Sequence, residues 1–168
     1  MHAWLCDNPT GVDAVAWKEL PTPRPGAGEV LIAIKAASLN FPDLLIVQNK
    51  YQMKPPLPFV PGSEFAGVIE AVGDGVKNLK PGQAVAAFSG TGGFATHACV
   101  NAAVVMPLPP GFAFDDAAAF VLTYGTTHHA LVDRAALKAG ETLLVLGAAG
   151  GVGTAAIQIG KAVGARVI

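Results

Sequence analysis

The chain has 168 residues, of which 52% are hydrophobic, and its 11 Lys and Arg against 12 Asp and Glu give a net charge of −1. With so balanced a charge and no cluster of basic residues, we expect no nucleic-acid partner and no anionic membrane surface. The two cysteines, Cys6 and Cys99, lie far apart and outside any metal-binding spacing. They indicate a reduced, cytoplasmic protein, and the N-terminus lacks the segments of a secretion signal.

Two uncharged stretches, residues 81–114 and 142–160, are long enough to raise the question of a membrane span. Several prolines and the Gly-Thr-Gly-Gly cluster at 90–93 interrupt the first, and the second carries polar and glycine positions in its middle. A spanning helix has neither feature, so we expect no membrane insertion.

Residues 1–110 have the pattern of short β-strands separated by glycine and proline. Residues 29–36, 67–73 and 83–88 are apolar runs that favour strands. The prolines and glycine of 21–26 predict a rigid loop, and Lys80-Pro81-Gly82 predicts a turn. Several strands at such close spacing predict a small barrel-like domain.

Beyond residue 111 the hydrophobic pattern becomes helical. Two aspartates follow Phe114 and favour the start of a helix, which we expect to run toward Arg134 with an interruption at Gly125. A fully apolar strand is then predicted over 142–146, as in a buried parallel sheet.

A glycine-rich turn follows that strand at once. A helix over 155–163, ended by Gly164, and a second strand from 165 to 168 come next. This order predicts the opening of a βαβ unit. Because such a unit alone leaves apolar faces uncovered, we expect either a fragment or a covering partner.

The turn at residues 147–153 has the character of a dinucleotide-binding loop. With Gly153 as the last position, Gly150 is the second glycine and Ala148 takes the place of the first, giving A-x-G-x-x-G. The position after a strand and before a helix is the context that phosphate binding requires. The alternative is a purely structural turn. The residue that selects NAD or NADP is expected beyond Ile168.

Several segments together resemble one family, the zinc-independent quinone oxidoreductases of the medium-chain dehydrogenase/reductases, which include zeta-crystallin. The resemblance implies a mixed α+β fold: a GroES-like β-barrel catalytic domain over residues 1–112, then the incomplete start of a Rossmann NAD(P)-binding domain over 113–168. The matching segments, in family order, are Asn40-Phe41-Pro42-Asp43-Leu44-Leu45, Lys50-Tyr51, residues 58–69, Val72-Gly73, residues 124–131 and Ala148-Ala149-Gly150-Gly151-Val152-Gly153.

The resemblance also addresses zinc. Zinc-using relatives place a Cys where this chain has Asn40, a His where it has Ser63, and a Cys or acidic ligand near Leu122. Amide, hydroxyl and isobutyl groups do not supply the three protein ligands of a catalytic zinc site. We therefore expect no metal.

Three residues are candidates for catalysis. Asn40 has a donor and an acceptor and could hold the nicotinamide carboxamide or polarise a substrate carbonyl; the alternative is a turn-forming Asn after a strand. Tyr51 could donate a hydrogen bond or a proton to the substrate, or simply pack on the barrel. Thr126 matches the family threonine near the nicotinamide, at the start of the interdomain helix, or else caps that helix.

The cofactor-binding set is then Asn40 and Thr126 together with the turn residues Ala149, Gly150, Gly151, Val152 and Gly153. Other polar residues point less clearly to chemistry. The adjacent His128 and His129 cannot form a metal pair on one helix face, and His97 is interpreted as a partly exposed strand residue. Asp43 and Glu64 resemble structural acids that hold loops behind the cleft.

The resemblance implies an NADPH-dependent reductase that transfers hydride to a small-molecule quinone or enone. One alternative is reduction of an enoyl or 2-alkenal substrate, including thioesters. The other is a non-catalytic, truncated module that associates with a second copy or with a complementary Rossmann portion.

Overall fold

A computed structural model describes all residues, 1–168, and the chain forms two compact units. The N-terminal unit comprises Met1–Ala119 and the C-terminal unit Phe120–Ile168. None of the helices is long and apolar enough to cross a membrane.

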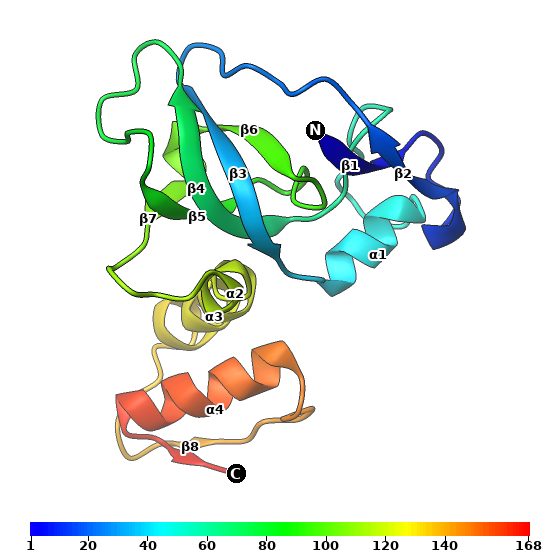
Figure 1. The fold of residues 1–168 in the computed structure, drawn as a ribbon. Helices are drawn as coiled ribbons and strands as arrows, with labels where there is room; N and C mark the ends of the chain where they lie inside the picture. Colours follow the sequence, from blue (N-terminus) through cyan, green and yellow to red (C-terminus); the bar gives the residue numbers. More distant parts are fainter. The chain divides into compact units, whose positions relative to one another are not determined.

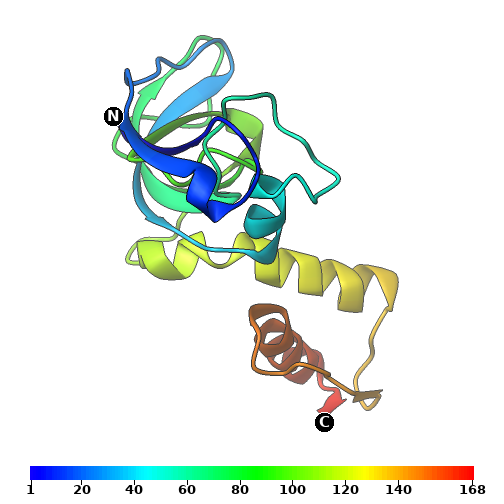
Figure 2. The same cartoon turned by 90° about the vertical axis from the view of Figure 1, so that its right-hand side faces the viewer.

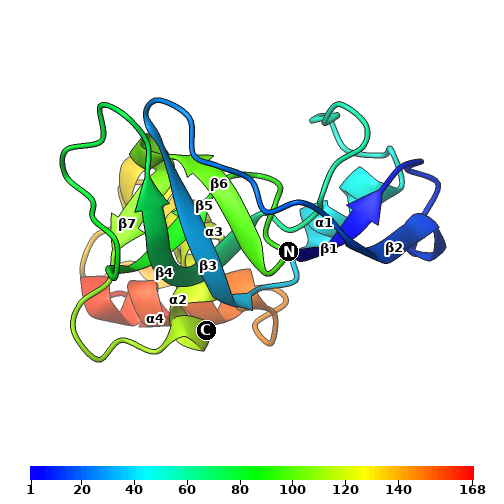
Figure 3. The same cartoon turned by 45° about the horizontal axis from the view of Figure 1, so that its top comes forward.

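A curved, five-stranded antiparallel sheet dominates the N-terminal unit (Figure 1). The strand order is β6-β3-β4-β5-β7, so β4 is the middle strand and β3 lies beside it (Figure 3). The three strands predicted over 29–36, 67–73 and 83–88 are confirmed, and the second of them begins earlier, at Glu64. The bounds are β3 (Glu29–Ala37), β4 (Glu64–Val72), β5 (Ala84–Phe88), β6 (His97–Asn101) and β7 (Val105–Pro107).

The main hydrophobic core lies against this sheet. Phe65 and Val30 are completely buried, and burial of each such side chain stabilises the fold by roughly 1.5–3 kcal/mol. At Gly67 of β4 a Cβ atom would lie 2.1 Å from the Ala33 carbonyl oxygen of β3, so only glycine allows the central strands to approach. The buried members of the core are Val30, Ile32, Phe65, Ile69, Leu79, Val85, Ala87, Ala98, Val100 and Val105.

The pairing of β3 with β4 is irregular at two places. The register shifts between Leu31 and Ile32 and again between Ile34 and Ala36. Glu70 of β4 and Lys35 of β3 have no residue opposite them in this strand pairing, and both are exposed. Such bulges bend a strand and increase its twist, which helps the sheet to curve around its core.

A second, smaller layer surrounds the first residues of the chain. Strands β1 (His2–Cys6) and β2 (Val15–Glu19) pair antiparallel, with the short 3₁₀ helix η1 (Val12–Ala14) between them, and lie beside α1 (Phe41–Val47) (Figure 3). Cys6, Ile46, Val47 and Phe59 form its core.

A 3₁₀ helix and a short α-helix complete the N-terminal unit. The 3₁₀ helix η2 (Ala102–Val104) joins β6 to β7, and α2 (Phe114–Ala118) contacts β3, β4 and β5. Ala117 and Ala118 are its buried residues.

The C-terminal unit is built from two helices and a short parallel strand pair (Figure 2). Helix α3 (Val121–His128) continues as the π-helix η3 (His129–Arg134). After it come β8 (Thr142–Leu143), α4 (Gly151–Val163) and β9 (Arg166–Val167). A Cβ atom on Gly160 would lie 2.8 Å from Leu143 and 3.0 Å from Val167, so this glycine lets α4 lie directly on the strand pair.

Two expectations about this part of the chain are wrong in detail. The helical stretch breaks at Ala119 and Phe120, where α2 ends, whereas Gly125 lies within α3. Glycine in a helix costs about 1 kcal/mol, and packing of α3 on α4 offsets that cost.

The strand predicted over 142–146 is limited to Thr142 and Leu143, and Leu144 and Leu146 are 63% and 84% exposed. An apolar strand of a parallel sheet is buried where other layers cover both faces of the sheet, and here the sheet is only the pair β8-β9. The βαβ order is confirmed, and the helix ends at Gly164, whose φ of 88° favours glycine. Helix α4 begins at Gly151, earlier than the predicted 155.

Candidate active site

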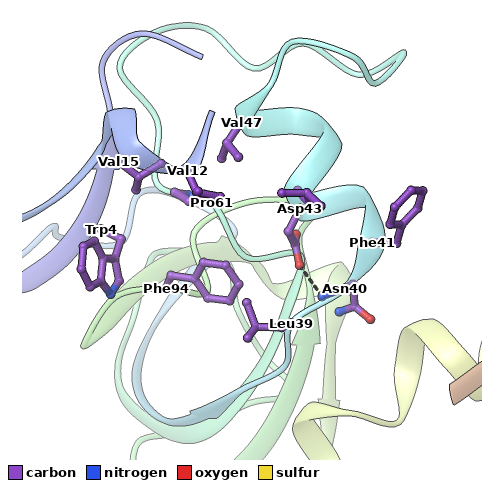
Figure 4. A pocket seen from close by; sticks show the side chains of 11 residues that line it. Trp4, Val12, Val15, Leu39, Asn40, Phe41, Asp43, Val47, Pro61 and Phe94 are labelled. Atoms are coloured by element: carbon purple, nitrogen blue, oxygen red, sulfur yellow. Dashed lines mark hydrogen bonds between the residues drawn. The ribbon is translucent and has the colours of Figure 1, made fainter. Parts of the chain in front are cut away.

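The N-terminal unit contains an apolar pocket of about 410 Å³ at the start of α1 (Figure 4). Large apolar side chains near it are unusually exposed, Leu39 at 87% and Phe41 at 71%. Asn40 and Asp43 supply the polar groups among its apolar walls. The remaining lining residues are Trp4, Val12, Val15, Leu44, Val47, Pro61 and Phe94.

Asn40 is held where β3 gives way to α1. It precedes the first residue of the helix, and its backbone N–H donates to Asp43 Oδ2 at 2.9 Å. Asp43 is 3% exposed and also accepts a hydrogen bond from Ser63 Oγ at 2.5 Å. An Asn followed by Pro and Asp is a typical helix start, because the carboxylate satisfies an otherwise unpaired N–H. Asn40 thus has the structural role that the sequence left open as an alternative.

A second buried carboxylate contacts the Asn40 side chain. Glu64 is 1% exposed, and its Oε1 accepts from Ser38 Oγ at 2.7 Å and from Asn40 Nδ2 at 3.2 Å. Asn40 Nδ2 also donates to Ser38 Oγ at 2.8 Å. Asp43 and Glu64 therefore both hold the loop that carries Asn40, as expected of structural acids. Ser38 belongs to this network, although its residue type gave no signal in the sequence.

Tyr51 lies elsewhere in the same unit. Its half-buried side chain packs against the small core around Cys6 and Phe59, and it does not line the pocket that contains Asn40. This is the packing role that the sequence left open. The role of Tyr51 as a donor to substrate remains a prediction.

Thr126 belongs to the C-terminal unit and is exposed. It lies within α3, near its C-terminal end, so the expectation that it starts or caps a helix is wrong. The neighbouring Thr127 is buried, and its Oγ1 donates to the Thr123 carbonyl at 2.7 Å. Helix α3 already begins at Val121, before Thr126.

The glycines in the turn between β8 and α4 differ in whether backbone conformation or packing requires glycine. Gly147 has a φ of 71°, so it occupies the tight-turn position that the sequence pattern assigned to Ala148. A Cβ on Gly153 would lie 2.4 Å from the Gly147 carbonyl oxygen, and one on Gly151 would lie 2.9 Å from Thr123. The fold therefore requires glycine at 147, 151 and 153. A glycine pattern alone did not identify Gly147.

Gly150 differs from these three. Its φ of −79° and ψ of 165° suit any residue, and the nearest atom to a Cβ there would be 3.6 Å away. Neither backbone conformation nor packing requires glycine at this position. A missing side chain at the N-terminus of α4 fits a ligand that approaches the backbone closely, as a pyrophosphate does.

The first turn of α4 offers suitable donors. Backbone N–H groups in the first turn of a helix have no partner within the helix, and they carry partial positive charge. Gly151 and Val152, which begin this turn, are exposed. Together with Gly150, which leaves the backbone uncovered, they fit a dinucleotide phosphate.

The histidines and cysteines do not gather into a further site. His97 Nε2 lies 3.3 Å from Glu70 on the neighbouring part of the sheet, and His129 Nδ1 lies 3.0 Å from Asp133. No group of three or more His, Cys, Asp or Glu side chains could hold a metal ion. Burial raises the pKa of both thiols, Cys6 and Cys99, above its ordinary value.

Comparison with known proteins agrees with this architecture. The family model of the alcohol dehydrogenase GroES-like domain matches residues 26–110. The chain is 41% identical over 151 residues to human quinone oxidoreductase, covering 89% of this chain and 46% of the relative. It is 39% identical over 155 residues to the rat synaptic vesicle membrane protein VAT-1 homolog, covering 91% and 38%.

Two solved structures bear on the site. The quinone oxidoreductase of Thermus thermophilus, described alone and in complex with NADPH, has a TM-score of 0.86 and 35% identity. The comparison covers 99% of this chain and 52% of that one. The CurK enoyl reductase has a TM-score of 0.89 and 28% identity, covering 99% and 53%.

The chain thus spans about half the length of these relatives, or less. The expected fold, a GroES-like domain in a mixed α and β chain, is confirmed. The chain belongs to the alcohol dehydrogenase GroES-like family within the medium-chain dehydrogenase/reductases, an oxidoreductase superfamily in which its relatives include quinone oxidoreductases.

Proposed function

We propose that this chain belongs to a cytoplasmic, NADPH-dependent, zinc-independent oxidoreductase that reduces a quinone or an activated carbonyl such as an enone. The observation that carries the proposal is Gly150, a glycine that the fold does not require, at the N-terminus of a helix. The NADPH complex of the Thermus thermophilus relative supports the choice of cofactor.

The proposed cofactor-binding residues fall into two groups. The N–H groups of Gly151, Val152 and Gly153 bind the pyrophosphate, with Ala149 and Gly150 leaving room for it. Asn40 and Thr126 hold the nicotinamide end. When bound, NADPH supplies the hydride, and the protein supplies position and hydrogen bonds.

The substrate is proposed to be a small, largely apolar molecule. The pocket beside Asn40 is bounded by Trp4, Leu39, Phe41 and other largely apolar side chains, which suit an uncharged ring or an alkenyl chain. Tyr51 is proposed as a donor to the reduced substrate. Zinc has no role, because Asn40 and Ser63 replace the ligands that a zinc site needs.

An enoyl or 2-alkenal reductase is the second candidate. The likeness to the CurK enoyl reductase favours it, and the same apolar pocket would suit an acyl chain. Steady-state rates on a quinone and on an enal, measured side by side with NADPH, distinguish the two.

The cofactor proposal is tested by fluorescence titration of the chain with NADPH and NADH. We expect saturable NADPH binding, and Gly150→Ala should weaken it about 10- to 100-fold, which corresponds to one or two lost hydrogen bonds to a charged group. Gly26→Ala is the matched control, because its added Cβ would meet only the flexible end of Glu29.

Two results would overturn the proposal. One is a folded chain that binds neither cofactor; the function would then depend on association with a second copy or a complementary Rossmann portion. The other is a Gly150→Ala variant that binds NADPH as tightly as the wild type, which would make the turn purely structural.

A further inference from the structure

We propose that Glu64 and Ser38 are positioning residues that fix the direction of the Asn40 amide, and that Asn40 consequently selects a ligand group that donates a hydrogen bond. The inference rests on the proposed function and narrows it. The sequence left two roles for Asn40, holding a carboxamide or polarising a carbonyl, and the hydrogen bonds around it favour the first.

The carboxylate of Glu64 determines which end of the amide faces it. Its Oε1 accepts from Asn40 Nδ2 at 3.2 Å and from Ser38 Oγ at 2.7 Å, in a position that is 1% exposed. An ionised carboxylate only accepts hydrogen bonds, and an amide donates only through its nitrogen. The amide nitrogen must therefore be the end turned toward Glu64.

Ser38 reinforces the same orientation. Its hydroxyl hydrogen is used toward Glu64, so its oxygen accepts from Asn40 Nδ2 at 2.8 Å. If the Asn40 amide rotated by half a turn, its oxygen would lie at hydrogen-bond distance from the Glu64 carboxylate, where its nitrogen lies now. That rotation would lose two hydrogen bonds, one of them to a charged group, and place two acceptors together.

The carbonyl end of Asn40 is correspondingly left for a ligand. In the first turn of α1 the Asp43 N–H donates to the main-chain oxygen of Asn40 at 3.0 Å. In Figure 4 the amide oxygen and nitrogen of Asn40 point to different sides. The oxygen accepts only from a donor, such as the NH₂ of a nicotinamide carboxamide. It cannot polarise a quinone carbonyl, which is itself an acceptor.

One measurement tests the amide orientation without cofactor. Solvent exchange of the Asn40 side-chain NH₂ is followed by NMR in the 17.1 kDa chain. We expect slower exchange than for the exposed Asn49, and about tenfold faster exchange in Glu64→Gln, because loss of a charge-assisted hydrogen bond is worth about this factor. Glu70→Gln, the same change at an exposed position of β4, is the matched control and should change nothing.

A second measurement tests the choice of ligand group. Dissociation constants are compared for NADPH and for its 3-acetylpyridine analogue, in which a methyl group replaces the carboxamide NH₂. We expect about tenfold weaker binding of the analogue by wild type, from the loss of one hydrogen bond, and equal binding of both by Asn40→Ala. Glu64→Gln and Ser38→Ala should reduce the ratio, and Glu70→Gln should not.

The outcomes separate the two proposals. Rapid NH₂ exchange in wild type, or exchange unaffected by both Glu64→Gln and Ser38→Ala, overturns the positioning role whether or not cofactor binds. Equal affinity of wild type for both cofactors overturns donor selection while leaving the proposed function intact. If NADPH does not bind at all, the proposed function and the donor selection that rests on it fail, and the NMR result still decides the positioning role.

Discussion

The buried Asp43 carboxylate should contribute strongly to the stability of the N-terminal unit. Asp43→Ala leaves two donors, the Ser63 hydroxyl and the Asn40 N–H, without their acceptor at a site that is 3% exposed. Each unpaired buried group costs about 1–3 kcal/mol, so the variant should lose about 2–6 kcal/mol. Asp43→Asn should lose only about 1–2 kcal/mol, because its oxygen can serve the N–H while the serine hydroxyl turns to accept from its nitrogen.

Urea unfolding followed by tryptophan fluorescence measures these costs. Both tryptophans, Trp4 and Trp17, lie in strands of the N-terminal unit, so the signal reports on the unit that contains Asp43. Asp74→Ala, at an exposed turn, is the control and should stay within about 0.5 kcal/mol of wild type. The reasoning is refuted if Asp43→Ala stays within the same limit, or if Asp43→Asn is as damaging as Asp43→Ala.

Three further changes have definite expected outcomes. Gly67→Ala should cost about 3 kcal/mol or more in thermal unfolding, since its Cβ would lie 2.1 Å from the Ala33 oxygen; a near-neutral result would mean that the strands separate freely. Burial raises the pKa of Cys6, so the unfolded chain ionises first as pH rises above 9.0. The free energy of unfolding, measured with urea, should therefore be lower above that pH than below it, and Cys6→Ala should show a smaller decrease. Identical pH profiles of the two proteins would contradict this. Tyr124→Phe removes a 2.7 Å hydrogen bond to Gln158 and should cost about 0.5–1.5 kcal/mol in a circular dichroism melt, whereas an unchanged melt would show that the bond contributes nothing.

The strands of the N-terminal unit were predictable because their apolar, β-branched runs are bounded by glycine and proline. The strand at 142–146 was not, because burial of an apolar run depends on neighbouring strands that the run itself does not specify. The helix break predicted at Gly125 was wrong for a related reason. The cost of glycine in a helix is local, whereas the packing of α3 on α4 that offsets this cost involves residues distant in sequence.

For the candidate site, the A-x-G-x-x-G pattern identified the glycine turn, and resemblance to a family identified Asn40. It did not identify Ser38 or the exposed Leu39, whose residue types carry no chemical signal by themselves. Gly147 was missed because a glycine pattern does not state which position has a positive φ. Thr126 was assigned to a helix start by the resemblance, whereas α3 begins at Val121.

The two bulges between β3 and β4 bear on the site although they lie outside it. Glu70 puts the strands one residue out of step, and Lys35 restores the original alignment. Because of that restoration Ala37 faces Phe65, and the Ser38 hydroxyl reaches Glu64. If Lys35 were paired instead of bulged, it would face Ala66, and Ala37 would face Glu64 in place of Phe65. The alignment of the Asn40 network therefore depends on two bulges at exposed, charged residues.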